Sequence, residues 1–262
     1  MESNGMSHIG KVFICGAGPG DPGLITIRAL DLISSCEVVL YDRLVSRQIL
    51  EKIPQDIIKV YVGREVGDPT THQDNTNDLM LKYAREGKKV LRLKGGDPMI
   101  FGRGGEEAEF LRAQNIPFEI IPGISSAIGS CTYAGIPLTH RKYSSSVAIV
   151  TGHEDPEKDS SRVNWSSLAV AVDTIVILMG LGSLDRIIKD LINAGMNSEV
   201  DVAVIENGTT PDQRVIKGTL GSISKLLVSN KVKAPSVIVI GRTVSLHDII
   251  SWFTADKNER IA

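Results

Sequence analysis

Residues 92–107 read RLKGGDPMIFGRGGEE, and this stretch decides the fold class. An apolar run at 90–93 enters it and a helical pattern leaves it at Glu106, so two glycine pairs and a proline join a strand to a helix. Glycine lets backbone approach a ligand closely, and Pro98 fixes one turn. Open α/β sheets bind ligands beyond the carboxyl ends of their strands. The stretch therefore predicts a binding loop in an α/β domain, although Gly-Gly-Asp-Pro by itself is also ordinary turn chemistry.

A second glycine loop, GAGPGDPG at 16–23, follows an apolar run at 11–15 and precedes another helical pattern. Dinucleotide sites have this order too, but their fingerprint needs glycine at the first, third and sixth places. Gly16 and Gly18 fit the first two places, whereas Asp21 occupies the sixth. The prolines also remove N–H groups that a pyrophosphate would bind. The loop therefore disfavours a nicotinamide-dependent oxidoreductase.

Strand-like and helix-like segments alternate along the first half of the chain, which predicts a parallel sheet covered on both faces. Helical spacing begins with Leu24 and Ile27 and continues through Leu30 and Ile33. The expected strands are 11–15, 37–41, 57–62, 90–93 and 118–121, and the later helices are 73–86, 106–112 and about 126–134.

The second half is also α/β, with a sheet that we expect to be mixed. Asn207-Gly208 lies between two strand-like runs and predicts a hairpin with a long turn. Ser183 is a candidate cap for a helix that carries Leu184, Ile187, Ile188 and Leu191 on one face. The expected strands are 147–150, 175–179, 202–205, 215–218 and 237–240. The polar stretch 137–146 divides the chain into domains 1–141 and 142–262, with the glycine loops facing a cleft between them.

Composition indicates a globular protein that is neither disordered nor strongly charged. The 262 residues are 42% hydrophobic and 23% charged, with a formal charge of −2. These values argue against a general nucleic-acid surface. The first ten residues lack an apolar core, and no apolar run approaches the roughly 20 residues that span a bilayer. We therefore expect a cytoplasmic protein without a nucleic-acid or membrane partner.

The three cysteines, Cys15, Cys36 and Cys131, are far apart and form no metal-binding pattern. An odd number suits free thiols in a reducing compartment. Cys15 lies inside an apolar strand pattern, so it is expected to be a small core residue. The sequence predicts no metal site.

Several motifs in fixed order resemble the tetrapyrrole methylase family, over about 10–253. They are GAGPGDP at 16–22, YDRLVS at 41–46, the whole of 92–107, PGISS at 122–126, PLTHR at 137–141, TGH at 151–153, LMG at 178–180 and ENGT at 206–209. The resemblance implies S-adenosylmethionine as methyl donor, S-adenosylhomocysteine as product, two α/β domains with the cofactor between them, and a homodimer. It further implies methylation of a small tetrapyrrole, uroporphyrinogen III, at C2 and C7 to give precorrin-2 for siroheme or cobalamin synthesis.

The same resemblance assigns cofactor-binding positions on both halves of the chain. S-adenosylmethionine has no phosphate, so it needs close backbone contact and apolar cover for its adenine. Ile100 and Met179 suit that cover, although both residue types are also common in cores. The implied positions are Pro19, Gly95, Gly96, Asp97, Ile100, Ser125, Ser126, Met179 and Gly208.

Asp42 matches the family's proton acceptor and Arg64 its proton donor, a position that is commonly lysine. Arginine, with a pKa above about 12, stays charged and is a poor proton donor at neutral pH. Its planar fork suits a carboxylate instead. We therefore interpret Arg64 as a substrate clamp, while an exposed loop charge and a proton donor remain alternatives.

The substrate carries acetate and propionate groups, which cationic loop residues could bind. The candidates besides Arg64 are Arg43, Arg103, His140 and Arg141; each could also be a solvated surface charge. Other functions stay open: a sister methylase acting on a later corrinoid, a modified protein or RNA, a nicotinamide-dependent oxidoreductase, and a non-catalytic cofactor-binding regulator. The match over 92–107 and at PLTHR favours the first-step enzyme.

Overall fold

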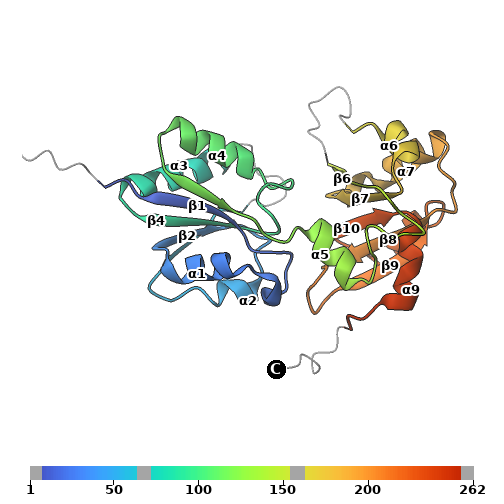
Figure 1. Ribbon diagram of the computed structural model, residues 1–262, viewed down its shortest axis with the longest axis horizontal. Helices are drawn as coiled ribbons and strands as arrows, with labels where there is room; N and C mark the ends of the chain where they lie inside the picture. Colours follow the sequence, from blue (N-terminus) through green and yellow to red (C-terminus); the bar gives the residue numbers. More distant parts are fainter. Residues whose placement is uncertain (1–7, 64–71, 154–162, 255–262) are drawn as a thin grey trace, which may run out of the picture. The chain divides into compact units, whose positions relative to one another are not determined.

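The computed structural model describes residues 8–63, 72–153 and 163–254 (Figure 1). The chain divides into two compact units, Met1–Ser125 and Ser126–Ala262. This division precedes the boundary that the sequence predicts at 141/142, because helix α5 (Ser126–Tyr133) packs on strands β7 (Thr174–Leu178) and β10 (Ser236–Ile240) of the second unit. In the described part of the chain, no helix has the length and apolar character needed to cross a membrane.

The first unit contains the predicted parallel sheet, with strand order β3-β2-β4-β1-β5. Central β1 pairs in parallel with both of its neighbours, and β2 lies between β4 and β3. All five carboxyl ends therefore lie at one edge, where the glycine loops begin. The strands are β1 (Lys11–Gly16), β2 (Val38–Tyr41), β3 (Ile58–Tyr61), β4 (Lys89–Lys94) and β5 (Phe118–Ile121).

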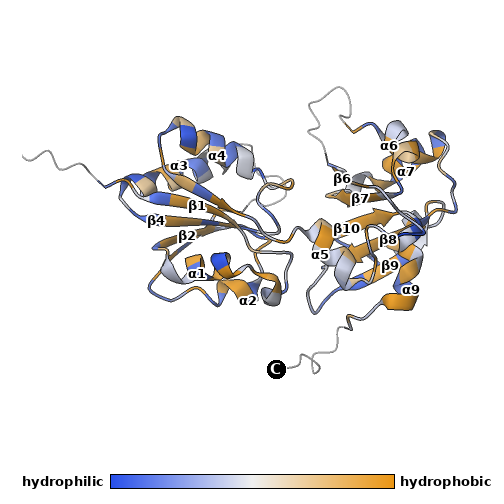
Figure 2. Cartoon of the chain, in the orientation of Figure 1, coloured by the Kyte–Doolittle hydropathy of each residue, from blue (hydrophilic) through white to orange (hydrophobic). Residues whose placement is uncertain are grey.

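Helices cover both faces of this sheet. Helices α1 (Ile27–Ser35) and α2 (Arg47–Leu50) lie on one face, and α3 (His72–Arg85) and α4 (Gly104–Ala113) lie on the other (Figure 1). Figure 2 shows that the strands between them are predominantly hydrophobic.

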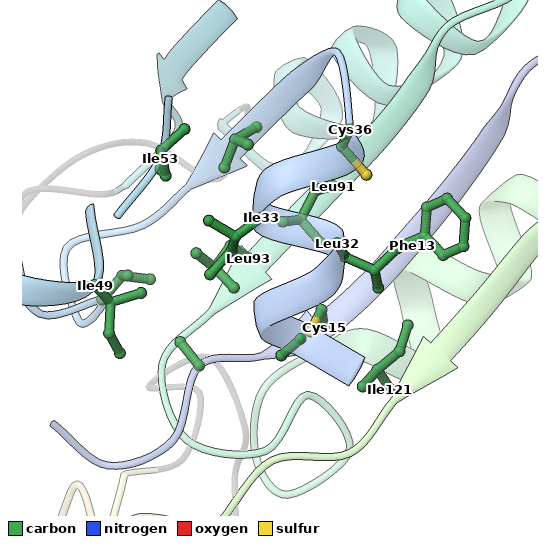
Figure 3. Packing of buried hydrophobic residues seen from close by; sticks show 14 of the residues in the cluster. Phe13, Cys15, Leu32, Ile33, Cys36, Ile49, Ile53, Leu91, Leu93 and Ile121 are labelled. Atoms are coloured by element: carbon green, nitrogen blue, oxygen red, sulfur yellow. The ribbon is translucent and has the colours of Figure 1, made fainter. Parts of the chain in front are cut away.

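Helix α1 begins where the Thr26 hydroxyl accepts a hydrogen bond from the N–H of Ala29, at 3.1 Å. Its buried residues are Ala29, Leu32 and Ile33, and Figure 3 shows Leu32 and Ile33 packed among side chains of the sheet. Ile27, which the helical spacing includes, is 83% exposed, and Leu24 belongs to a separate 3₁₀ turn. The spacing therefore predicts the helix correctly, but Ile33 is the one residue of that spacing that is buried.

All three cysteines are buried free thiols. Burial raises the pKa of Cys15 to about 12, of Cys36 to about 11 and of Cys131 to about 12. Cys15 and Cys36 lie toward opposite ends of α1 within one core cluster (Figure 3). The prediction that Cys15 is a core residue is confirmed.

The second unit contains a mixed sheet with strand order β6-β7-β10-β8-β9. Strands β6 and β7 are parallel, and β10 is antiparallel to β7 and to β8. Strands β8 and β9 form the antiparallel pair predicted around Asn207-Gly208, so the mixed sheet is confirmed. The strands not yet given are β6 (Val147–Thr151), β8 (Asp201–Glu206) and β9 (Arg214–Thr219).

Helix α7 (Leu184–Asn193) buries the four apolar side chains that the sequence predicts, Leu184, Ile187, Ile188 and Leu191. Ser183 precedes it but makes no capping bond, so that prediction is wrong. Its hydroxyl instead donates to the carbonyl oxygen of Gly152, joining the loop after β6 to the loop after β7. The other helices are α6 (Trp165–Ala171), α8 (Ile223–Ser229) and α9 (His247–Ile250).

Candidate functional site

The loops that follow β1 and β4 are joined by backbone hydrogen bonds at the carboxyl edge of the first sheet. The N–H of Gly96 donates to the carbonyl oxygen of Gly18 at 2.7 Å, and the reverse bond measures 3.1 Å. Gly96 has φ +70°, a backbone conformation that a side chain would strain. Both glycine-rich stretches that the sequence singles out therefore belong to one loop cluster.

Asp97 joins the loop after β5 to the same cluster. One carboxylate oxygen accepts the N–H of Met99 at 2.8 Å, and the other accepts the N–H of Gly123 at 2.9 Å. A Cβ atom at Gly123 would lie 2.3 Å from the carbonyl oxygen of Gly96. The glycines are therefore needed for close packing of the loops against one another, whether or not a ligand is bound.

The first glycine loop is built unlike a dinucleotide loop. Pro19 and Gly20 lead to Asp21, whose carboxylate accepts the N–H of Gly23 at 2.8 Å and caps the short 3₁₀ helix η1 (Pro22–Leu24). Helix α1 does not begin until Ile27. The place that a pyrophosphate-binding glycine would take is thus occupied by a negatively charged cap.

Apolar side chains are exposed beside these loops. Met99, Ile100 and Phe101 are 53%, 41% and 45% exposed, and Leu44 is 53% exposed. Gly95 packs against the backbone and Cβ of Leu44. The alternative that Ile100 is a core side chain is therefore wrong. A run of exposed apolar residues is typical of a surface that binds a ligand or another protein.

Asp42 follows β2, and both of its carboxylate oxygens have a neighbour. Oδ1 accepts the N–H of Leu44 at 3.0 Å, and Oδ2 lies 3.5 Å from Nη2 of Arg92. The Asp42 side chain is 23% exposed. Arg43 beside it is exposed, while Arg64 lies outside the described residues.

A buried ionic cluster lies behind Asp42. Glu107 Oε1 accepts hydrogen bonds from Arg92 Nε at 3.0 Å and from Lys94 Nζ at 2.9 Å. Burial would raise the pKa of Glu107, but Arg92 and Lys94 hold that pKa below its usual range. Burial and the nearby Arg92 lower the pKa of Lys94. All three residues lie in the stretch 92–107, but the sequence did not lead us to assign them a role in the site. The available signal was the pair of positive charges at alternate positions of an apolar strand, Arg92 and Lys94.

Arg103 lies where the loop turns into α4, with φ 59°. Its Nε donates to Glu106 at 2.8 Å, so the guanidinium already has a carboxylate partner in its own helix. Since both side chains are substantially exposed, this ion pair contributes little to stability, and Arg103 can bind another carboxylate in place of Glu106.

In the second unit, Met179 and Gly208 lie in loops after β7 and β8. Met179 has φ 55° and is 53% exposed, so it is not a core side chain. Gly208 lies between Asn207 and Thr209, whose φ values are 49° and 68°. A Cβ atom at Gly208 would lie 2.1 Å from the Ser130 hydroxyl of α5, so this loop rests directly on that helix.

His140 and Arg141 lie in the polar stretch before β6, which Asp173 fixes. One Asp173 oxygen accepts the N–H groups of Ser145 at 2.7 Å and Ser146 at 3.1 Å, and these bonds lower the pKa of Asp173. The N–H of Lys142 donates to Nδ1 of His140 at 3.2 Å. A neutral His140 therefore carries its proton on Nε2 and presents a donor there.

Each unit holds part of the predicted site. Pro19, Asp42, Gly95, Gly96, Asp97, Ile100 and buried Ser125 belong to the first unit; Ser126, His140, Arg141, Met179 and Gly208 belong to the second. Among the residues that the structure describes, no His, Cys, Asp or Glu side chains are grouped as a metal site would require.

The family model described as Tetrapyrrole (Corrin/Porphyrin) Methylases matches residues 11–224. The S-adenosyl-L-methionine-dependent uroporphyrinogen III methyltransferase of Methanosarcina barkeri is 51% identical over 243 residues, covering 93% of this chain and 95% of the relative. The siroheme synthase of Nitrosomonas europaea is 46% identical over 94% of this chain. The chain spans about half the length of that synthase, 51%.

The fold is also similar to a solved structure of uroporphyrin-III C-methyltransferase from Thermus thermophilus in complex with S-adenosylhomocysteine. That protein is 36% identical, the TM-score is 0.76, and the similarity covers 90% of this chain and 93% of the other.

Proposed function

The chain belongs to the tetrapyrrole methylase family, and we propose that it methylates uroporphyrinogen III at C2 and C7, with S-adenosylmethionine as donor, to give precorrin-2. The observation that carries this proposal is the 51% identity to a uroporphyrinogen III methyltransferase along almost the whole of both chains. The product would serve siroheme or cobalamin synthesis. We also propose that the protein acts as a homodimer, as the family resemblance implies, and that it is cytoplasmic, as the composition of the chain leads us to expect.

The cofactor positions suit a ligand without phosphate. Exposed Ile100 and Met179 can cover an adenine, and the Gly95–Asp97 turn presents backbone at the carboxyl edge of the sheet. Pro19, Ser125, Ser126 and Gly208 complete the proposed set. When bound, S-adenosylmethionine supplies an electrophilic methyl group to an electron-rich pyrrole carbon, and alignment of the two can contribute up to about 7–11 kcal/mol.

Asp42 is the proposed base. A methylated macrocycle is cationic and must lose a proton, and a carboxylate held by Leu44 and Arg92 is ready to accept it. Because each carboxylate oxygen of Asp42 has a fixed neighbour, the orientation of the carboxylate toward the substrate proton is also fixed.

Cationic loop residues are the proposed contacts for the substrate's carboxylates. Arg43 and Arg141 are exposed, and Arg103 can exchange its Glu106 partner for a propionate. His140 offers an Nε2 donor, and Arg64 is the proposed bidentate clamp.

The test is a reaction and two titrations. The protein is incubated with methyl-labelled S-adenosylmethionine and uroporphyrinogen III, and the product is weighed; two added methyl groups are expected. Calorimetric titration should show binding of S-adenosylhomocysteine and none of NAD. Micromolar NAD binding without S-adenosylhomocysteine binding would overturn the methylase proposal, whereas methylation of a later corrinoid alone would favour the sister enzyme.

A further inference from the structure

We propose that Arg92 is a positioning residue for Asp42, and that Glu107 and Lys94 hold Arg92 in place for this role. The proposal rests on the proposed function, in which Asp42 accepts a proton from the methylated substrate. It adds three residues whose side chains are almost completely buried.

Arg92 comes from the middle of the sheet and reaches the end of the neighbouring strand. It is paired with Leu40 in the β2–β4 register, and Asp42 lies two residues beyond Leu40. The Arg92 side chain is 6% exposed, compared with 23% for Asp42. Arg92 is therefore behind the carboxylate, and Asp42 keeps the more accessible position.

The three guanidinium nitrogens of Arg92 have three different partners, two through hydrogen bonds and one through an ion pair. Nε donates to Glu107 at 3.0 Å, Nη1 donates to the carbonyl oxygen of Leu93 at 3.2 Å, and Nη2 lies 3.5 Å from Asp42 Oδ2. The guanidinium is planar and rigid, so two fixed nitrogens also determine the direction of the third. Arg92 thus transfers the rigidity of the buried cluster to Asp42.

Asp42 also adds a negative charge next to this cluster. Arg92 and Lys94 supply two positive charges, and fully buried Glu107 supplies one negative charge. A buried cation is costly unless a negative charge lies close to it, and the Asp42 carboxylate places a second one 3.5 Å from Arg92.

The experiment is a double-mutant cycle of Arg92→Gln with Asp42→Asn, measured by kcat for uroporphyrinogen III methylation. Each single variant should reduce kcat, Arg92→Gln by about tenfold to a hundredfold, the range that misplacement of a reacting group can reach. S-adenosylhomocysteine affinity should stay unchanged. In the Asp42→Asn background, Arg92→Gln should cost almost nothing further, because the group it positions is already absent.

Two further variants separate positioning from general damage. Arg92→Lys keeps the positive charge in the cluster, so the variant should still fold, but lysine cannot reach the three partners of the guanidinium. It should therefore lower kcat in the parent enzyme and have almost no effect in the Asp42→Asn background. Arg28→Gln removes an exposed ion pair with Glu119 in the same unit and should leave kcat unchanged.

The outcomes are distinguishable. The positioning role would be overturned if the kcat losses of Arg92→Gln and Asp42→Asn multiplied in the double variant. It would also be overturned if the Arg92→Lys enzyme had a normal kcat. A normal kcat for Asp42→Asn would instead remove the base assignment on which the proposal rests, while leaving the methylation test unaffected.

Discussion

Gly123→Ala is the sharpest test of the loop cluster in the first unit. The added Cβ would lie 2.3 Å from the carbonyl oxygen of Gly96 and 2.9 Å from two backbone atoms of Gly16. All of these neighbours are backbone, so none can rotate away, and the loops after β1, β4 and β5 must separate. Overpacking of this kind costs about 1–3 kcal/mol. Separation also weakens the bond from Gly123 to the Asp97 carboxylate, a class worth about 1.5–3 kcal/mol.

We therefore expect Gly123→Ala to lower the free energy of unfolding by about 2–4 kcal/mol, since the two costs overlap. Urea denaturation measures this loss, and calorimetry should show weaker S-adenosylhomocysteine binding. Gly105→Ala is the matched control, because its Cβ would meet only the Met99 methyl at 4.0 Å. Alanine in helix α4 should leave stability unchanged or raise it by up to about 1 kcal/mol. If the two variants were indistinguishable in stability and affinity, the packing interpretation would be refuted.

Three further predictions concern single side chains. Arg64→Lys should mainly raise KM for uroporphyrinogen III, because lysine lacks the bidentate fork; steady-state kinetics that showed a higher kcat instead would favour the proton-donor role. Glu107→Gln should lower the free energy of unfolding by about 3–5 kcal/mol at pH 7 by leaving buried cations unpaired. Because the folded-state pKa of Glu107 lies below its ordinary 4.5, its contribution is present above that value and lost on acidification, so the variant should lose less stability than the parent as the pH falls from 7 to 3. Ser183→Ala should cost about 0.5–1.5 kcal/mol for the lost bond to Gly152, without a loss of helicity in circular dichroism, since the hydroxyl does not cap α7.

The fold class could be predicted from the sequence because the strands are apolar and bounded by turn residues. The strand 118–121 coincides with β5, and 90–93 differs from β4 only by a lysine at each end. The strand order could not be predicted, because it depends on pairing between segments far apart in the chain. Likewise, the buried face of α1 depends on where the sheet lies, and Ile27 satisfies the helical period without contacting the core.

The candidate site was predictable where a residue's chemistry is local and not where it depends on a distant partner. The αL backbone at Gly96 and the exposure of Met179 agree with loops that were interpreted as binding segments. The role of Asp97 as a link between two loops depends on Gly123, which lies 26 residues further along the chain. The Arg92–Glu107 pair likewise becomes visible only when α4 packs against the first sheet, on β1 and β5.

Backbone strain gives an independent reason to regard these loops as functional. In the described part of the chain, seven residues other than glycine have positive φ. Asn115 and Lys231 lie just after α4 and α8, where a left-handed residue commonly ends a helix. The other five follow strands and lie at no helix C-terminus: Phe101, Arg103, Met179, Asn207 and Thr209. Arg103 is the residue just before α4, and Asn207 is a turn residue of a type that adopts this conformation readily, so Phe101, Met179 and Thr209 are the clearest cases. Such conformations cost of order 1–3 kcal/mol each and persist at ligand-binding loops, where the strain is part of the function. The loops after β4, β7 and β8 carry this strain together with the proposed cofactor positions.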